Sequence, residues 1–597
     1  MTISLDIANL ERLYAKGETT PEHIVREVYA RIRIRGVLPD WITLVEEDAA
    51  VAKAREAKPG PLYGIPFAVK DNIDVKGLPT SCACPEFAYV AERSATIVEL
   101  LQQAGAILIG KTNLDQFATG LNGTRSPYGI PTSTFNPDYI SGGSSSGSAV
   151  AVATGLISFA LGTDTAGSGR VPAAFNNIVG LKPTKGLISM RGVVPACRTQ
   201  DTVSIFALTV ADAARVALTA IGLDEEDAFA RSGAPRFSVK DAPKPLRVGV
   251  PQGNMPFFGD AHYESLYRAA IDRIAALGAK LVPIDYAPFE QAASMLYAGP
   301  WVAERLAAVG DLIHRNPDAI HPVVRSILLG ARDKTAVDTY QAFYQLADLI
   351  RAARSEWAKM DLLLLPTAGT TFTITEMLAD PIKLNSRLGT YTNFVNLMDL
   401  AALAVPAGFR PDGIPFGVTL IGPALSDGML ASASDALHRS FGDMKLGATS
   451  SPLSSTPPVS SDVNPTKFVK VAVVGAHLSS QPLNSQLVER NATLVETTRT
   501  GAGYRLYALA NTSPPKPGLV FDGTGVGGIE VEIWEMDEGA FGSFVAAIPS
   551  PLGIGTLTLA DGRTVKGFVC EARATRGAED ITEFGGWRAW LARSTAV

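Results

Sequence analysis

Two Gly/Ser-rich segments stand close together in the chain: Ser141-Gly-Gly-Ser-Ser-Ser-Gly-Ser148 and Gly162-Thr-Asp-Thr-Ala-Gly-Ser-Gly-Arg170. The apolar run 149–162 between them is about 14 residues long, short of the roughly 20 that a membrane helix needs, so it indicates buried core. We expect it to form a helix of small residues and then a strand at 157–161. Loops with little side-chain bulk and many free N–H groups can hold an anion or developing negative charge.

A lysine upstream completes the set of candidate reactive groups. Lys70 ends the apolar strand predicted at 65–69, in Gly64-Ile-Pro-Phe-Ala-Val-Lys70. Burial at a strand end lowers the pKa of a lysine because it disfavours the charged form, and a neutral lysine can act as a general base. Taken alone, a Ser-rich loop is usually a flexible turn and such a lysine is usually solvated. Only the joint occurrence of the three segments in this order favours a site.

These three segments resemble the amidase signature family, in which the two serines have the spacing seen here between Ser144 and Ser168 (168 − 144 = 24). The resemblance implies that Ser168 is the nucleophile, Lys70 the base and Ser144 the relay between them, with a cis Gly143–Ser144 bond. It also implies that Asp164 and Arg170 brace the loop.

The same resemblance implies an oxyanion hole made by the N–H groups of Thr165, Ala166, Gly167 and Ser168. Ala166 stands where most members have glycine. Its methyl group should be tolerated if the backbone φ is negative.

Two further segments, 113–128 and 296–305, look like those of the allophanate hydrolases within that family. This resemblance implies a small anionic, urea-derived substrate whose carboxylate needs a fixed cation. Arg305 suits this role because its planar fork pairs bidentately with carboxylates, and Tyr297 and the backbone of Gly120 are the other substrate contacts it implies. Without the resemblance, Arg305 would be read as a surface helix residue.

The implied reaction is hydrolysis of allophanate to ammonia and carbon dioxide through an acyl-enzyme, in nitrogen metabolism. The pathway is either urea degradation or the breakdown of biuret or a triazine. The alternative is another amidase of the family, acting on a small carboxylated amide such as malonamate, on aryl amides or in transamidation on tRNA. A catalytically inactive scaffold is the remaining possibility. No metal or organic cofactor is expected, since the six histidines show no metal-ligand spacing.

Alternating strands and helices predict an α/β/α sandwich with a mixed central sheet. Expected strands include 65–69, 106–110, 157–161, 361–365 and 417–421, and 96–104 is an expected helix. We place the amidase domain at 1–447, with N-terminal helices over about 1–60 and the catalytic core over about 60–447. The Ser/Thr/Pro-rich run 448–466 predicts a linker.

Residues 467–597 predict a smaller α+β domain, similar to the gamma-glutamyl cyclotransferase-like fold. Strands are expected at 471–474, 504–509, 530–535 and 556–560, a hairpin turn at 560–563, and helices at 537–547 and 578–592. In the family this domain has been linked to decarboxylation, for which His477 is the candidate. The alternative is that it only assists assembly.

Composition limits the partners. Hydrophobic residues make up 46% of the 597 residues and charged residues 19%, and the net charge of −6 argues against a nucleic-acid partner. Nothing in the charge pattern favours a membrane surface. The four cysteines are too few for a disulfide scaffold, and the N-terminus lacks an apolar signal region, so we expect free thiols and a cytoplasmic protein. The family resemblance implies a homodimer.

Overall fold

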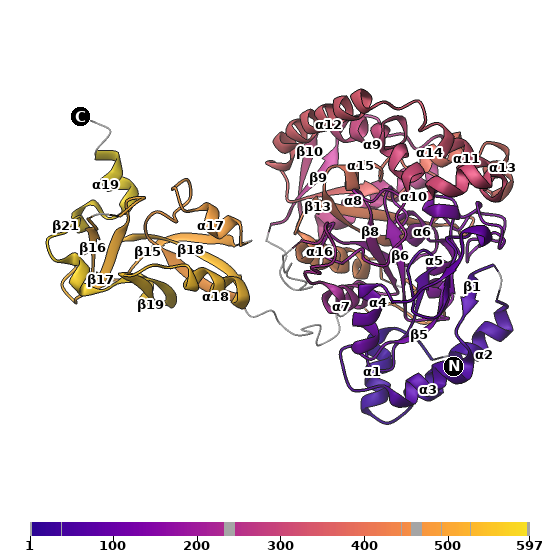
Figure 1. The fold of residues 1–597 in the computed structure, drawn as a ribbon, viewed down its shortest axis with the longest axis horizontal. Coiled ribbons are helices and arrows are strands. Elements are labelled where there is room, and N and C mark those ends of the chain that lie inside the picture. Colours follow the sequence, from indigo (N-terminus) through magenta and orange to yellow (C-terminus); the bar gives the residue numbers. More distant parts are fainter. Residues whose placement is uncertain are drawn as a thin grey trace. The chain divides into compact units, whose positions relative to one another are not determined.

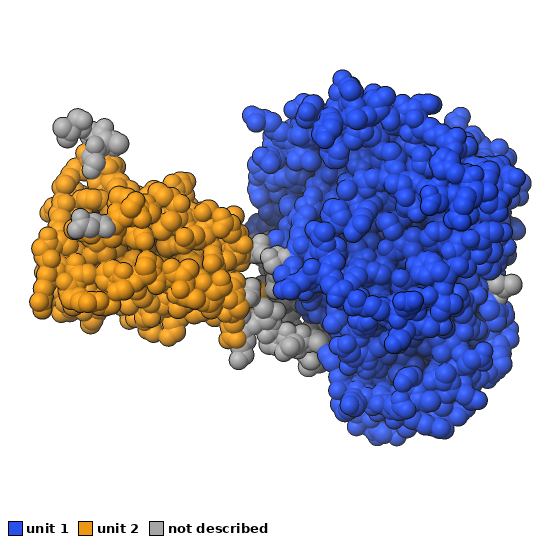
Figure 2. Space-filling view, in the orientation of Figure 1, with its two compact units in different colours: residues 1–463 blue, residues 464–597 orange. Residues whose placement is uncertain are grey.

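The computed structural model describes residues 3–37, 39–231, 245–442, 444–454, 468–490, 492–510, 512–525 and 527–593. The chain divides into two compact units, residues 1–463 and 464–597 (Figure 2). Each unit has an apolar core of its own.

The first unit is built on an 11-stranded sheet, counted over the described residues, with helices around it (Figure 1). In spatial order the strands are β1 (Trp41–Leu44), β5 (Ile107–Thr112), β2 (Pro66–Lys70), β6 (Phe159–Asp164), β8 (Thr202–Ala207), β7 (Val179–Lys182), β12 (Leu400–Phe409), β13 (Pro415–Pro423), β11 (Leu362–Pro366), β9 (Arg247–Pro251) and β10 (Lys280–Ile284). Strand β2 runs parallel to β5 and β6, whereas β8 pairs antiparallel with β6 and β7. The predicted mixed sheet is therefore confirmed.

Every residue of β2, β5, β6, β7, β8 and β11 is buried, as expected for strands covered on both faces. The helices are α1 (Ile7–Ala15), α2 (Pro21–Arg35), α3 (Glu47–Glu56), α4 (Thr96–Gln103), α5 (Ser146–Ala153), α6 (Val171–Phe175), α7 (Val210–Ala220), α8 (Ala261–Ala276), α9 (Ala287–Ala298), α10 (Trp301–Arg315), α11 (Pro322–Leu329), α12 (Ala336–Trp357), α13 (Ile374–Ala379), α14 (Lys383–Leu388), α15 (Phe394–Leu397) and α16 (Asp427–Ser440). Helix α5 is entirely buried, because its Gly, Ser, Ala and Val side chains leave room for close packing on the sheet. A two-stranded sheet, β3 (Pro79–Thr80) with β4 (Tyr89–Val90), completes the unit.

The start of the predicted linker packs on the first unit. The Ala448 N–H donates to the Ala153 carbonyl (2.8 Å), and the Leu453 side chain is buried. The remainder of that segment, from residue 455 to residue 466, lies outside the described residues. The predicted domain limits stay predictions.

Over its described residues, the second unit contains a five-stranded and a three-stranded sheet. The first has the order β15 (Thr493–Arg499), β18 (Glu530–Asp537), β14 (Phe468–Val473), β20 (Thr564–Cys570), β19 (Leu552–Thr558), and the second β17 (Pro517–Phe521), β16 (Tyr504–Ala508), β21 (Glu579–Asp580). The helices are α17 (Ser485–Val488), α18 (Glu538–Ala546) and α19 (Trp587–Arg593). The predicted hairpin turn joins β19 to β20 and is closed by a hydrogen bond from the Leu559 N–H to the Arg563 carbonyl (2.8 Å).

One predicted helix of this unit is wrong. Residues 578–592 do not form a single helix, because 579–580 pair with β16 and helix α19 begins only at Trp587. Gly585 adopts a positive φ of 66°, which ends the preceding turn and separates the two parts. Strand pairing with Ala508 and Tyr507 therefore outweighs the helical preference of the alanines.

Candidate active site

Lys70 is the last residue of the buried central strand β2. Its Nζ lies 2.8 Å from the Ser144 Oγ and 2.8 Å from the Thr163 Oγ1, and the side chain is fully buried. Burial lowers the pKa of Lys70 from 10.5 to about 7, against the opposing pull of the nearby carboxylates, Asp115 foremost. About half of the amine is then neutral near pH 7, which a general base requires.

Ser144 lies on the loop that leads into helix α5, and its peptide bond with Gly143 is cis. The Ser144 carbonyl accepts a hydrogen bond from the Asp115 N–H at 3.0 Å. Thus the loop is tied to the segment that follows β5.

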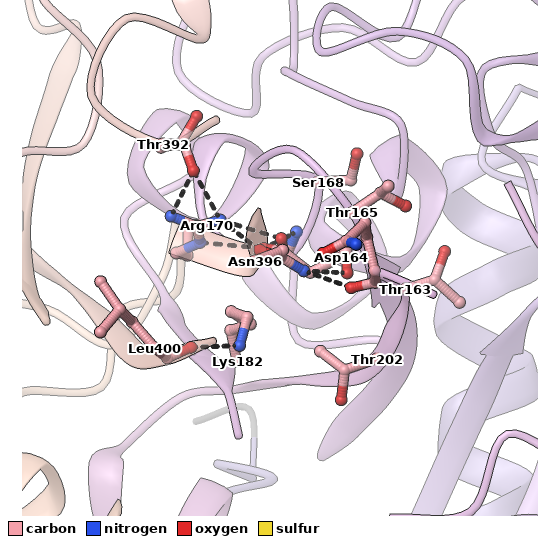
Figure 3. A network of polar contacts seen from close by, with 12 residues as sticks. Thr163, Asp164, Thr165, Ser168, Arg170, Lys182, Thr202, Thr392, Asn396 and Leu400 are labelled. Carbon is pink, nitrogen blue, oxygen red and sulfur yellow. Dashed lines mark hydrogen bonds and ion pairs between the residues drawn. The ribbon is translucent and has the colours of Figure 1, made fainter. Parts of the chain in front are cut away.

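Ser168 follows β6, four residues after its end at Asp164. Its Oγ donates to the Gly120 carbonyl at 3.5 Å and makes no hydrogen bond to Ser144 in this arrangement of the described residues. Figure 3 shows the hydroxyl of Ser168 directed away from the contacts of Asp164 and Arg170. A rotation about χ1 is needed before Ser168 can pass a proton to Ser144, and staggered rotamers of serine interconvert readily.

The predicted oxyanion loop covers residues 165–168. Within the described part of the chain, none of its four N–H groups donates a hydrogen bond, which leaves them available for a ligand. Gly167 has a φ of 138°, and a Cβ there would meet the Thr392 Oγ1 at 2.4 Å. Ala166 does not adopt a positive φ, so its methyl group is accommodated as predicted.

A buried ion pair between Asp164 and Arg170 stabilises the loop of residues 165–168. The Asp164 carboxylate accepts from the Arg170 Nη2 (2.9 Å) and from the Gly169 N–H (2.9 Å), and both side chains of the pair have no exposed surface. Burial would raise the pKa of Asp164, but the charge and hydrogen bonds of Arg170 outweigh it and hold that pKa below its usual value. The Asn396 amide donates to the Asp164 carbonyl at 2.8 Å, which ties the loop to helix α15 (Figure 3).

A second buried lysine, Lys182, lies at the end of β7 near this pair (Figure 3). Its Nζ donates to the carbonyls of Leu400 (2.6 Å) and Pro183 (3.0 Å). Burial lowers its pKa to about 7. Lys182 contacts neither Ser144 nor Ser168, and so it is not an alternative base for the relay.

Asp115 was missed at the sequence level. Its carboxylate accepts from the N–H groups of Gly123 (3.0 Å) and Arg125 (2.9 Å), which shapes the loop that carries Gly120. It also fits between two glycines: a Cβ on Gly120 or Gly143 would approach its Oδ2 to 2.5 or 2.2 Å. Asp115 lies in the segment 113–128 quoted above, but nothing in its local sequence, Leu114-Asp115-Gln116, indicates this role.

Arg305 and Tyr297 come from the neighbouring helices α10 and α9. The Arg305 Nη1 donates to the Thr119 Oγ1 (3.1 Å), and its Nη2 lies 3.5 Å from the Tyr297 hydroxyl. Only 2% of Arg305 is exposed, and among the described residues its guanidinium contacts Ala118, Thr119 and Tyr297 but forms no ion pair. Thr119 precedes Gly120, so the structure brings the predicted substrate residues to the Ser168 side of the site.

His477 belongs to the second unit. It lines a cavity of about 250 Å³ together with Gln486, Lys516 and Phe568. Its Nε2 lies 3.0 Å from the Gln486 Oε1, and its ring stacks on that of Phe568. Burial lowers the pKa of His477, so the imidazole is mainly neutral at pH 7.

Other sequence-level expectations concern cysteines, metals and membranes. The four cysteines are free, as predicted. Among the described residues no cluster of three or more His, Cys, Asp or Glu side chains is placed to hold a metal ion. In the same part of the chain, no helix has the length and apolar character needed to cross a bilayer.

Residues 25–431 match the family model described as Amidase, and residues 469–592 match the one described as Allophanate hydrolase C-terminal domain. The chain belongs to the amidase family, a class of amidohydrolases that act on C–N bonds. The family predicted from the three motifs is thereby confirmed.

Individual relatives narrow the comparison. The chain is similar to the urea amidolyase of Saccharomyces cerevisiae (44% identity over 575 residues, covering 92% of this chain and 31% of that protein), so it spans about a third of that relative. The urea amidolyase of Lachancea kluyveri is 43% identical over 602 residues, covering 96% of this chain and 32% of that protein. The chain is also similar over 100% of both chains to the structure of Kluyveromyces lactis allophanate hydrolase (41% identity, TM-score 0.74).

Proposed function

We propose that the chain hydrolyses allophanate, urea-1-carboxylate, to ammonia and carbon dioxide. The observation that carries the proposal is the buried Arg305, which forms no ion pair with any described residue and lies beside the loop that contacts Ser168. A buried cation of this kind is costly unless a ligand supplies the counter-charge. The whole-chain likeness to the K. lactis allophanate hydrolase structure supports the same substrate.

The first half of the proposed reaction forms an acyl-enzyme. Ser168 Oγ attacks the terminal carbamoyl carbon while its proton passes through Ser144 to the neutral Lys70. The free N–H groups of residues 165–168 stabilise the negative charge on the carbonyl oxygen, an effect whose loss costs on the order of 100- to 1000-fold in rate. The C–N bond to the terminal nitrogen then breaks, and ammonia leaves with the proton returned from Lys70 through Ser144.

In the second half of the reaction, water hydrolyses the acyl-enzyme and Ser168 becomes the leaving group. Water attacks the acyl carbon and gives its proton to Lys70 through Ser144, and Ser168 leaves as a hydroxyl. The product is N-carboxycarbamate, which loses one carbon dioxide to give carbamate. Carbamate then breaks down to the second carbon dioxide and the second ammonia, so that each allophanate yields two of each. Throughout, Arg305 and Tyr297 hold the substrate carboxylate away from the reacting carbon.

The test is ammonia release from allophanate, measured beside biuret, malonamate and urea. Allophanate should have the highest kcat/KM, because the other three either lack the carboxylate or lack the urea nitrogen. Turnover of malonamate without turnover of allophanate would instead support the alternative amidase.

For the second unit we propose that the His477 cavity assists decarboxylation of N-carboxycarbamate. A neutral histidine and Lys516 line one cavity of a size suited to a small dianion, which supports this role. A role in assembly alone is the competing proposal. Carbon dioxide and ammonia release compared between the full chain and its His477→Ala variant decides between them.

We further propose a homodimer located in the cytoplasm. The four free, buried thiols are consistent with a reducing compartment. Light scattering on the purified chain tests the dimer, and a mass of 62.9 kDa per particle would exclude it.

A further inference from the structure

A second buried arginine adjoins the substrate loop. Arg125 is only 1% exposed. Its Nη1 donates to the Thr119 carbonyl (2.8 Å) and its Nη2 to the Pro381 carbonyl (2.7 Å), while its Nε has no partner in the described part of the molecule. All of its side-chain hydrogen bonds are with backbone oxygens.

Arg125 and Arg305 share one residue. Thr119 accepts from Arg125 through its carbonyl and from Arg305 through its hydroxyl, so both guanidinium groups fix the residue that precedes Gly120. The Nε of Arg305 is also buried without a partner among the described residues. Loss of Arg125 would release Thr119 and, with it, the placement of the Gly120 carbonyl that contacts Ser168.

Neither of the two cations has a directly paired carboxylate among the described residues. Both guanidinium groups hydrogen-bond to carbonyl or hydroxyl oxygens there instead, although both side chains are almost completely buried. Burial acts to lower the pKa of Arg305, but Tyr297, Cys197, Asp201 and Glu304 outweigh it and raise that pKa. Burial lowers the pKa of Arg125, Asp115 and Tyr297 oppose this effect, and the positive charge of Arg305 adds to it. Paired buried cations with unused N–H groups favour an anionic ligand over a neutral one of equal shape.

We propose that Arg125 is a positioning and specificity-determining residue of the amidase site, which fixes Thr119 and adds its charge to that of Arg305 in selecting amides that carry a carboxylate. The proposal rests on the proposed function, since it concerns the same substrate class. It differs from a purely structural role in one respect: the selectivity for charge should follow the charge at position 125, not the number of hydrogen bonds made there.

The test measures binding rather than turnover. Malonamate is the carbon analogue of allophanate, and malonamide is its neutral counterpart. Their Kd values are measured by calorimetry for the full chain carrying Ser168→Ala, which removes hydrolysis. Arg125→Met, Arg125→Gln and Arg125→Lys are then added singly, each with circular dichroism as a check on folding.

The readout is the ratio of the malonamide Kd to the malonamate Kd. Both neutral variants should lower this ratio roughly tenfold, and Arg125→Lys should retain it within about threefold. Arg31→Met is the matched control, because Arg31 also donates to two backbone carbonyls, those of Gly155 and Ile3, and should leave the ratio unchanged.

Equal weakening of both ligands by Arg125→Met or Arg125→Gln would overturn the proposal, as would the absence of any preference for malonamate in the Ser168→Ala chain. These outcomes are separable from failure of the proposed function. A chain that prefers malonamate but does not hydrolyse allophanate would retain the role of Arg125 and lose only the assigned reaction.

Discussion

The pH dependence of catalysis should report the protonation of Lys70. The base must be neutral to accept a proton, and burial lowers its pKa from 10.5 to about 7. We therefore expect kcat/KM to rise tenfold per pH unit well below pH 7 and to level off above about pH 8.

The gain in neutral Lys70 follows from comparing its lowered pKa with the ordinary pKa of a lysine. With a pKa of about 7, roughly half of the Lys70 side chains are neutral at pH 7. At the ordinary value of 10.5 the neutral share would be roughly 3 in 10,000. Burial of Lys70 at the end of β2 thus increases the neutral fraction of its amine at pH 7 on the order of 1,000-fold over that of a solvated lysine.

Thr163→Val perturbs this balance in a defined direction. The Thr163 Oγ1 accepts from the Lys70 Nζ at 2.8 Å, and an acceptor of this kind favours the ammonium form. Its removal should move the acid limb of the profile to lower pH, by up to about one unit. Thr154→Val is the control, because the Thr154 hydroxyl only bonds back to its own helix.

The assay is initial ammonia release from allophanate between pH 6 and pH 9, with enzyme-free blanks to subtract spontaneous breakdown of the substrate. A kcat/KM that still rises tenfold per unit at pH 9, a flat profile, or an acid limb that moves to higher pH in Thr163→Val would refute the reasoning. A shift of the same size in Thr154→Val would assign the change to packing instead.

Four further outcomes are expected. Ser168→Ala should abolish ammonia release while leaving the unfolding transition in place; residual turnover near the wild-type rate would remove Ser168 as nucleophile. Arg305→Ala should raise KM for allophanate at least tenfold with no comparable change for a neutral amide, and an unchanged KM would contradict the carboxylate contact. Arg170→Met should lower the free energy of unfolding by about 3–5 kcal/mol in chemical denaturation, because it leaves the Asp164 carboxylate buried and unpaired. His477→Ala should slow carbon dioxide release relative to the first ammonia; equal slowing of both would argue for assembly instead.

Local pattern was sufficient to predict much of the fold. Strands β2, β5, β6, β11 and β13 lie where short apolar runs predicted them, within a few residues at each end. Short continuous apolar runs are typical of strands that are covered on both faces. Pattern failed at 578–592, where a helical composition was overridden by pairing with β16, a contact between residues more than 70 positions apart in the chain.

In the candidate site, too, the sequence indicates the roles of some residues but not of others. Residues that carry chemistry, such as Lys70 and Ser168, stand in recognisable motifs. Residues that place them, such as Asp115, Thr163 and Arg125, lie in the same quoted segments, but nothing in those segments indicates their roles. Their partners are groups reached only after folding, from the Pro381 carbonyl to the N–H of Gly123, and no spacing in the sequence records those partners.

The fit of the Asp115 carboxylate between Gly120 and Gly143 constrains how the sequence can change. A methyl group on either glycine would collide with the Asp115 carboxylate, which accepts hydrogen bonds from the backbone N–H groups of Asn122, Gly123 and Arg125. Asp115 cannot rotate out of the way without breaking these hydrogen bonds. A saturation-mutagenesis map should therefore show these two glycines to be as intolerant as the reactive serines, although neither has a side chain to offer. Invariance at these positions among homologues would then record steric exclusion rather than chemistry.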